Sequence, residues 1–225
     1  PVILRKIEEG RVSQVDLADI MVLRYWVANH FALLVKTLEQ RATTLDPCTQ
    51  CGLMNTLSIN YREEMGVVGY DAGVAEPHAI WRAQLLHFIE ARTWRSIDSL
   101  TAFRLVNQYF QLVDRGNIFA AGGAMFYYEW RIAALDYPRL IKGFEQIYAD
   151  NPTFSRRPID QRHPLWHLVA HAEHDKNHAW DLWTALLHSV KTMRQARQTL
   201  AGVRYAQKCW KEFWNTVECE ILGPS

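Results

Sequence analysis

Apolar residues recur at helical spacing through almost the whole chain, and this feature constrains the fold most. Between residues 14 and 44, for example, apolar side chains fall along one side at Leu17, Ile20, Leu23, Tyr25, Val27, Phe31, Leu34, Val35 and Leu38. A spacing of three or four residues is typical of an amphipathic helix. Alternating β-branched runs and Asn-Gly or Asp-Gly hairpin turns, which would indicate strands, are nearly absent. We therefore predict an all-α fold.

The breaks in this pattern divide the chain into helices. Predicted helices cover 14–44, 51–65, 76–95, 98–114, 117–135, 164–189 and 191–220. Pro47 and Gly66 end the first two, and Ser96 or Asp98 could cap the fourth. The fifth could continue past Pro138 to residue 148. Because there is no internal repeat and no convincing boundary, we predict one domain, 1–225, of seven or eight helices.

Composition excludes several classes of protein. The chain has 225 residues, of which 49% are hydrophobic, and this supplies a substantial core. Its net charge of +1 gives no electrostatic footprint for nucleic acid or for a membrane surface, and the basic stretch 191–211 is interpreted as a solvated helix face. No apolar run of about 18 residues or more indicates a membrane span, and no signal peptide is recognisable at the start.

Cysteine usage is sparse, with residues at positions 48, 51, 209 and 219. The first pair forms a C-x-x-C motif, CTQC, which is found in zinc sites and in thiol redox centres. The second pair is ten residues apart, so a two-knuckle zinc pattern is not completed, and no strand precedes the motif as a thioredoxin-like site requires. We interpret the four thiols as reduced and incidental, which favours a cytoplasmic location.

The densest cluster of polar chemistry is HAEHDKNH at 171–178. Residues spaced i, i+4 and i+7 share one face of a helix, and this spacing joins His171, Asp175 and His178. His174 is rotated off that line by about 60° and Glu173 lies on the far side, whereas His167 continues the stripe one turn earlier. The alternative is a solvated polar face, but the flanking segments are apolar, and a buried stripe would be costly unless it is paired or metal-bound. We favour a metal site.

A metal site in the core requires partner acids in apolar surroundings. Glu129 is the best candidate, because IFAAGGAMFYYEWRIAAL contains one acid and one base, and Arg131 at i+2 points away from it. It is either a ligand or a buried hydrogen-bonded acid. One of Glu63 and Glu64, in NYREEMG, could also turn inwards. His78 and Glu39, judged in isolation, would more often be surface residues.

Taken together, these motifs resemble the haem-oxygenase-like di-iron oxidases and oxygenases. The matching features are NYREEMG followed by a helix-opening histidine, then GAMFYYE, then H-x3-D-x2-H, and they lie between residues 39 and 178. The resemblance implies a single-domain haem-oxygenase-like bundle with two Fe(II) ions as cofactors and O2 as co-substrate. It implies these metal ligands: Glu39, Glu64, His78, Glu129, His171, Asp175 and His178. Glu63, Asp136 and Glu145 are the substitutes for Glu39 or Glu64.

The donor chemistry agrees with this resemblance. Carboxylates and imidazoles without thiolates suit iron or manganese better than zinc or copper. The resemblance implies an O2-dependent oxidase or oxygenase of specialised metabolism that acts on a small molecule, and a homodimer is left open. The cluster FYYEW at 126–130 could stack on an aromatic, tryptophan-like amino acid, although ordinary helix packing explains it as well. Oxidative fragmentation, such as nitrile formation, is the reaction we expect. Arg62, Arg82 and Arg131 are candidates to bind a substrate carboxylate.

Two other classes of protein compete with this interpretation. His174-Asp175 is an HD dyad, which is found in metal-dependent phosphohydrolases, and His78 or His87 together with Asp181 could complete such a site. Adjacent residues point about 100° apart on a helix, however, so the dyad explains less of the stripe. The other class is a cofactorless helical binding protein of the same fold, in which the histidines would be hydrogen-bonded core residues.

Overall fold

The computed structural model describes residues 1–67, 77–89 and 100–223, and these residues form α-helices and one π-helical segment without any strand. The predicted all-α class is thus confirmed. The elements are α1 (Val2–Glu8), α2 (Gln14–Asn29), α3 (Phe31–Ala42), α4 (Pro47–Glu64), α5 (His78–Phe88), α6 (Leu100–Arg115), α7 (Ile118–Arg131), η1 (Ile132–Asp136), α8 (Tyr137–Ile147), α9 (Pro152–Ser155), α10 (Trp166–Ser189) and α11 (Met193–Leu222).

Each predicted helix has a counterpart, with shifted ends. The helix predicted at 14–44 is α2 followed by α3, and they meet at His30, whose carbonyl still accepts the N–H of Leu34 at 3.2 Å. Helix α4 begins at Pro47 instead of 51, because proline fits the first turn of a helix. Helix α5 ends at Phe88, and the predicted continuation to 95 and the caps Ser96 and Asp98 lie outside the described residues. The short helices α1 and α9 were not predicted.

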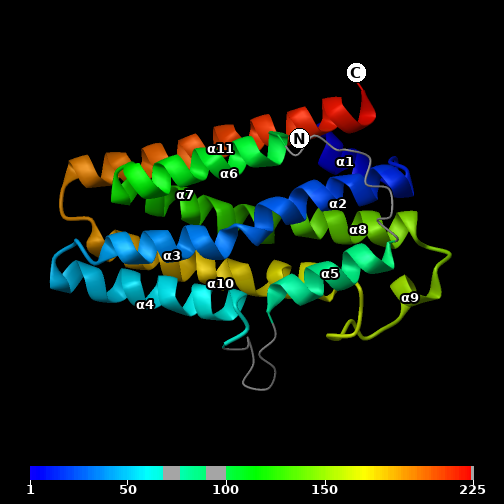
Figure 1. Ribbon diagram of the computed structural model, residues 1–225, viewed down its shortest axis with the longest axis horizontal. Helices are drawn as coiled ribbons and strands as arrows, with labels where there is room; N and C mark the ends of the chain where they lie inside the picture. The colour runs from blue at the N-terminus through cyan, green and yellow to red at the C-terminus, as the bar shows by residue number, and fades with distance from the viewer. Residues whose placement is uncertain (68–76, 90–99, 224–225) are drawn as a thin grey trace.

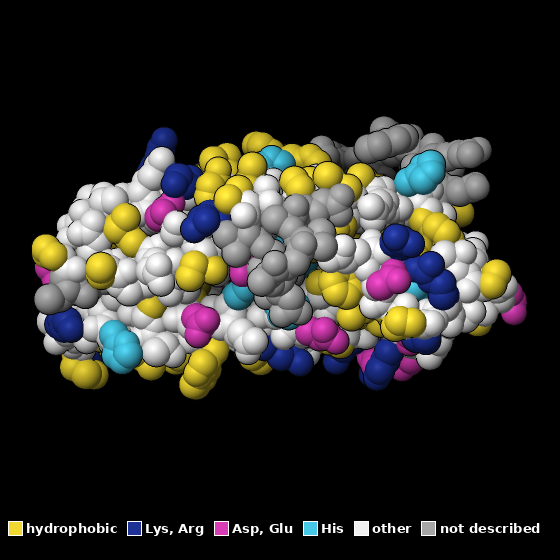
Figure 2. Space-filling model, turned by 90° about the horizontal axis from the view of Figure 1, so that it is seen from below, with side chains coloured by type: hydrophobic (Ala, Val, Ile, Leu, Met, Phe, Trp, Pro, Cys, Tyr) yellow, Lys and Arg dark blue, Asp and Glu magenta, His cyan; other side chains and the backbone are white. Residues whose placement is uncertain are grey.

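The helices run roughly along one long axis (Figure 1). Helices α6, α7 and α11 lie on one side of the bundle, α4, α5 and α10 lie on the other, and α2 with α3 passes between them. Helix α10 packs against α4, α5 and α7, and α11 packs along α7. Seen from the α4, α5 and α10 side, acidic, basic and hydrophobic side chains are interspersed on the surface (Figure 2). Helix α10 also packs against η1 and α8, so it lies along the interior of the bundle.

Helix α2 together with α3 is apolar enough to cross a membrane by length and composition alone. In the bundle, however, 67% of its apolar window is buried against other helices, as expected for a core helix. Its buried side chains include Leu17, Ile20, Leu23, Leu34 and Leu38, which the periodicity had placed on one side. The apolar character of this segment is thus accounted for by the core.

Helices α7 and α11 cross in backbone contact, and two glycines make this approach feasible. A Cβ atom on Gly202 would lie 1.9 Å from the carbonyl oxygen of Ala120, and one on Gly123 would lie 2.2 Å from that of Thr199. Both distances are far shorter than van der Waals contact, so any side chain would push the helices apart. The crossing holds α7, which carries Glu129, close to the centre of the bundle.

Helix α7 continues through η1 into α8, as predicted for the segment that passes Pro138. Proline lacks an N–H and cannot complete the α-helical ladder, and the wide turn Ile132–Asp136 precedes it in the chain. Asp136 lies in this turn and is fully buried, where it pairs with Arg131 at 3.1 Å and accepts a hydrogen bond from the indole of Trp214 at 3.2 Å. This arrangement makes Asp136 a paired core acid.

Candidate metal centre

Six side chains in the interior of the bundle form two adjacent groups of metal-type ligands. The first group is Glu64, His78 and His171, and the second is Glu129, Asp175 and His178. Within each group the three ligand atoms lie within 4.8 Å of one another. These six are six of the seven ligands that the resemblance implied. The structure therefore brings together residues that are up to 114 positions apart in the chain.

Four helices supply the two groups. Glu64 is the last residue of α4, His78 the first of α5, and Glu129 lies in the last turn of α7. The remaining three come from α10, where His171 and Asp175 are buried while Glu173 is exposed, as the helical spacing had predicted. His167, one turn earlier on the same face, is also buried. Only tertiary packing can bring α4, α5 and α7 to this face.

Asp175 links the two groups. Its carboxylate accepts a hydrogen bond from Nδ1 of His171 at 2.8 Å, and its Oδ1 lies 3.6 Å from Nδ1 of His178. Since Nδ1 of His171 is held by Asp175, its Nε2 faces the other way, where it lies 3.8 Å from Oε1 of Glu64. A carboxylate that orients an imidazole in this way is common behind metal-binding histidines.

The first group is already balanced by positive charge. Glu64 contacts Nδ1 of His78 at 3.0 Å and Nη1 of Arg82 at 3.3 Å. Burial alone would raise the pKa of Glu64, but His78 and Arg82 lower it well below its usual range. Arg82 also lies 3.5 Å from Nε2 of His167, and burial lowers the pKa of His167 and of His171. The carboxylate of Glu64 is thus ionised.

The second group carries an excess of carboxylates. Glu129 is 3% exposed and accepts a hydrogen bond from Asn60 at 3.2 Å. Burial, reinforced by the charge of Asp175, raises the pKa of Glu129 well above its usual range. Burial would lower the pKa of His178, but hydrogen bonds to Asp175 and to Glu63, the latter at 2.8 Å, raise it to about 11. The charge of these carboxylates is thus offset by a proton on His178 and favours protonation of Glu129, and a bound cation could replace both protons.

The remaining predicted acids lie outside the two ligand groups. Glu39 is in neither ligand group; it is buried in α3 and pairs with the partly exposed Lys36 at 2.6 Å. Among its substitutes, Glu145 pairs with Arg157 near the surface and Asp136 is the core acid described above. Glu63 alone reaches the site, through His178. Helical spacing could not reveal this, because it does not show which way the end of α4 turns.

The predicted carboxylate-binding arginines are distributed differently. Arg82 lies at the first ligand group, Arg131 pairs with Asp136, and Arg62 is exposed. Sequence reasoning missed Arg24, which is fully buried beside the ligand groups. The sequence could have indicated this burial, because Arg24 is the lone charged residue in the apolar run IMVLRYWV.

The HD dyad is not assembled as a phosphohydrolase site would require. His174 is partly exposed and belongs to neither ligand group, although Asp175 is buried. Of the residues nominated to complete that site, His78 is buried in the first ligand group, whereas His87 and Asp181 are both exposed. The aromatic cluster FYYEW is mostly packing, since Phe126 contacts Trp183 and Tyr127 contacts Trp130. Tyr128 is the aromatic member that lines the cavity beside the ligand groups.

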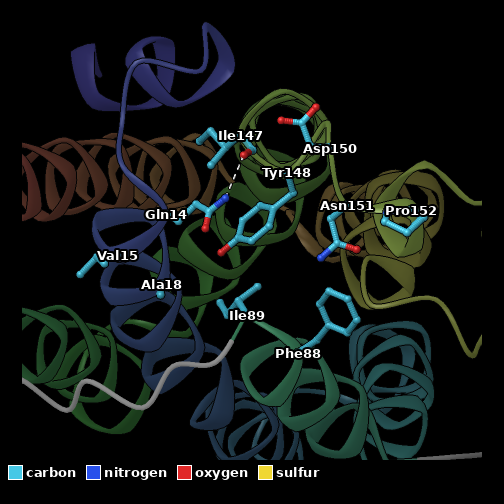
Figure 3. A pocket seen from close by; sticks show the side chains of 10 residues that line it. All are labelled: Gln14, Val15, Ala18, Phe88, Ile89, Ile147, Tyr148, Asp150, Asn151 and Pro152. Carbon is cyan, nitrogen blue, oxygen red and sulfur yellow. Dashed lines mark hydrogen bonds between the residues drawn. The ribbon is translucent and has the colours of Figure 1, made fainter.

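A small cavity of about 10 Å³ lies between the ligand groups, enough for roughly one water molecule. Tyr128, Tyr137, Arg24 and Arg82 line it together with Glu64, Glu129, His171 and Asp175. A larger cavity of about 650 Å³ lies elsewhere, among the start of α2 and the ends of α5 and α8 (Figure 3). Asp150 is its one acidic lining residue in the described part of the chain, and no histidine lines it there. The ligand-type chemistry is concentrated at the small cavity.

No protein-family model matches this sequence, and a search of curated proteins finds no match. The site is therefore characterised by its own geometry and electrostatics.

Proposed function

We propose that this chain is an O2-dependent non-haem di-iron oxidase or oxygenase of the haem-oxygenase-like kind. The observation that carries the proposal is the pair of adjacent buried ligand groups, linked through Asp175. Each group combines carboxylate with imidazole, and neither contains a thiolate. Such donors suit iron or manganese, and four helices with inward carboxylates and histidines resemble the framework of di-iron bundles.

The residues fit two metal ions on chemical grounds. Glu64, His78 and His171 would hold one ion, and Glu129, Asp175 and His178 the other, with Glu63 within reach of His178. The raised pKa of Glu129 supports this assignment, because a buried acid next to a second carboxylate is stabilised by a nearby cation. When bound, two ferrous ions would supply the reduction of O2.

The surrounding residues would control access and orientation. Asp175 holds the ring of His171 through its Nδ1, and Asn60 holds one oxygen of Glu129. Tyr128, Tyr137 and Ile132 line the cavity and are themselves buried, which would limit the access of water to the ligand groups. Exclusion of water protects reactive species and strengthens electrostatic interactions in the site.

For the substrate we propose an aromatic, tryptophan-like amino acid, with oxidative fragmentation of the kind that a nitrile synthase performs. The support is the aromatic lining beside the ligands: the ring of Tyr137 lies 5.8 Å from that of His171, and Tyr128 stacks on Phe31 at 4.5 Å. Because the cavity holds roughly one water molecule, such a substrate would enter only after the lining side chains move apart.

Anaerobic iron loading tests the proposal. The chelated protein is titrated with Fe(II), the bound iron is counted, and O2 is then admitted while uptake and the visible spectrum are followed. We expect about two irons per chain and rapid O2 uptake, since two ligand groups are present.

Other results would contradict the proposal. Phosphoester hydrolysis with zinc or manganese, without any response to O2, would indicate a phosphohydrolase. Failure to bind any divalent metal would indicate a cofactorless binding protein. With iron and O2 established, L-tryptophan and its ring-halogenated forms should accelerate O2 uptake. A fatty acid that does so in their place would overturn the substrate class.

A further inference from the structure

Arg24 is a fully buried arginine of α2 whose charge is held among aromatic rings. Its guanidinium carbon lies 5.1 Å from the centre of the Tyr137 ring, 5.2 Å from that of Trp210 and 5.8 Å from that of Tyr128. None of its three guanidinium nitrogens makes a hydrogen bond of good geometry to the described residues, although the hydroxyl of Tyr128 interacts with the guanidinium. The rings stabilise the cation through their faces, and the N–H groups in the guanidinium plane stay available.

The other two buried arginines near the centre of the bundle differ from Arg24. Arg82 pairs with Glu64, and Arg131 pairs with Asp136. A buried guanidinium without a hydrogen-bonding acceptor is costly, because its N–H groups have lost water and gained nothing equivalent. An anion that accepts from Arg24 would remove this cost.

The position of Arg24 indicates where such an anion would bind. Arg24 lines the same small cavity as Glu64, Glu129, His171 and Asp175. The cavity is therefore bounded by an available cation and by residues from both ligand groups. A ligand held at Arg24 would lie directly beside the proposed metal ions. The planar, bidentate geometry of guanidinium matches a carboxylate better than a spherical anion such as chloride.

We propose that Arg24 is a carboxylate-binding residue, and that it holds the α-carboxylate of the amino-acid substrate in the cavity beside the ligand groups. The identity of this substrate rests on the proposed function. The binding of a carboxylate at Arg24 does not, because it requires neither metal nor O2. Arg82 is less suited to this role, since Glu64 already occupies its guanidinium edge.

The experiment uses the full chain after removal of metal with a chelator. Formate and acetate are the small probes, chloride at equal ionic strength is the control, and L-tryptophan is compared with tryptamine, which lacks the carboxylate. Binding is measured by calorimetry and by the shift in melting temperature. In ¹⁵N-arginine-labelled protein, the Nε–H signal of Arg24, identified by its loss in Arg24→Lys, reports contact directly.

We expect formate or acetate to raise the melting temperature of the wild-type chain and to move the Arg24 signal. L-tryptophan should bind at least about 10-fold more tightly than tryptamine, as expected for a charge-assisted hydrogen bond. Arg24→Met should lose both effects. Arg24→Lys keeps the positive charge but loses the planar pair of N–H donors, so it should bind the carboxylates more weakly than wild type. Arg115→Met, at an exposed position at the end of α6, is the matched control and should behave like wild type.

Two outcomes would overturn the proposal. If the carboxylates stabilise the wild type and Arg24→Met equally, the anion binds elsewhere. If no carboxylate moves the wild-type Arg24 signal, Arg24 is only a core cation enclosed by aromatic rings. If Arg24→Met does not fold, the Arg24 signal of the wild type and carboxylate binding by Arg24→Lys still test whether Arg24 binds a carboxylate. Loss of iron binding or O2 uptake would count against the proposed function and leave this result unchanged.

Discussion

The two ligand groups contain the same donor types, yet they differ in how their charge is balanced. In the first group, Glu64 faces His78, His171 and Arg82, and its pKa is lowered. In the second group, Glu129 and Asp175 both line the cavity, no arginine of the described residues pairs with either, and the pKa of Glu129 is raised. The first group is stable without a metal. The second is electrostatically incomplete until it gains a cation or protons, so we expect it to bind metal more tightly.

Among the variants, removal of Asp175, which links the two groups, should have the largest effect on metal binding. Asp175 contacts His171 of the first group and belongs to the second, so Asp175→Ala should weaken both sites. We expect iron content to fall from about two to less than one per chain, with metal affinity reduced more than about 100-fold, the upper range for loss of an outer-sphere partner alone.

His171→Ala should also lower iron content, whereas His174→Ala, on the partly exposed side of the same helix, should change it little. Metal analysis of the three variants after identical loading checks this. Equal losses in all three would refute the assignment of the inward face of α10.

Replacement of a glutamate by the neutral glutamine should change the free energy of unfolding by different amounts in the two groups when no metal is bound. Glu64→Gln leaves Arg82 without its buried partner, so unfolding free energy should fall by about 3 kcal/mol at pH 7. Glu129→Gln resembles the protonated acid that is already favoured there, so stability should change by less than about 1 kcal/mol. Urea denaturation of the chelated proteins measures both values.

The pH dependence of these variants follows from the sign of each shift. The folded-state pKa of Glu64 is depressed, so its stabilisation is present above its ordinary value of 4.5 and is lost as the pH falls below it. The unfolding free energy of wild type should therefore exceed that of Glu64→Gln at neutral pH, and the difference should shrink in acid. If the difference in unfolding free energy between wild type and Glu64→Gln does not depend on pH, the charge of Glu64 does not stabilise the fold.

Metal binding should release protons, mainly from the second group. His178, with its pKa raised to about 11, holds a proton at pH 7, and burial favours a proton on Glu129 as well, so a metal must displace both. Apparent affinity should thus rise with pH. Calorimetry in buffers of different ionisation enthalpy should give about two protons released from this group.

Glu64→Gln should leave that proton count nearly unchanged, whereas Glu129→Gln should lower it by about one. If Glu64→Gln lowers the proton count and Glu129→Gln does not, the displaced protons come from the first group, and the proposed difference between the groups is wrong.

The sequence predicted the fold and the α10 face because both depend on local periodicity. Leu17 to Leu38 mark one buried side, and His171, Asp175 and His178 follow from residue spacing alone. The split at His30, the π-helical turn before Pro138 and the backbone crossing at Gly202 depend on which helix lies opposite. Arg24 was missed for the same reason, since its importance comes from the three aromatic rings of other helices that surround it.

Glu39 gives the smallest expected effect and tests the resemblance itself. The resemblance implied that Glu39 is a ligand, but its carboxylate pairs with Lys36, whose side chain is 40% exposed. A pair with one exposed partner is screened by solvent, so we expect it to contribute about 1 kcal/mol or less. Glu39→Gln should therefore leave both iron stoichiometry and stability close to wild type, with Lys36→Met as the matched control. If Glu39→Gln alone removes one iron, α3 must turn Glu39 inwards when metal binds, and the second group would gain a carboxylate that the metal-free arrangement keeps outside.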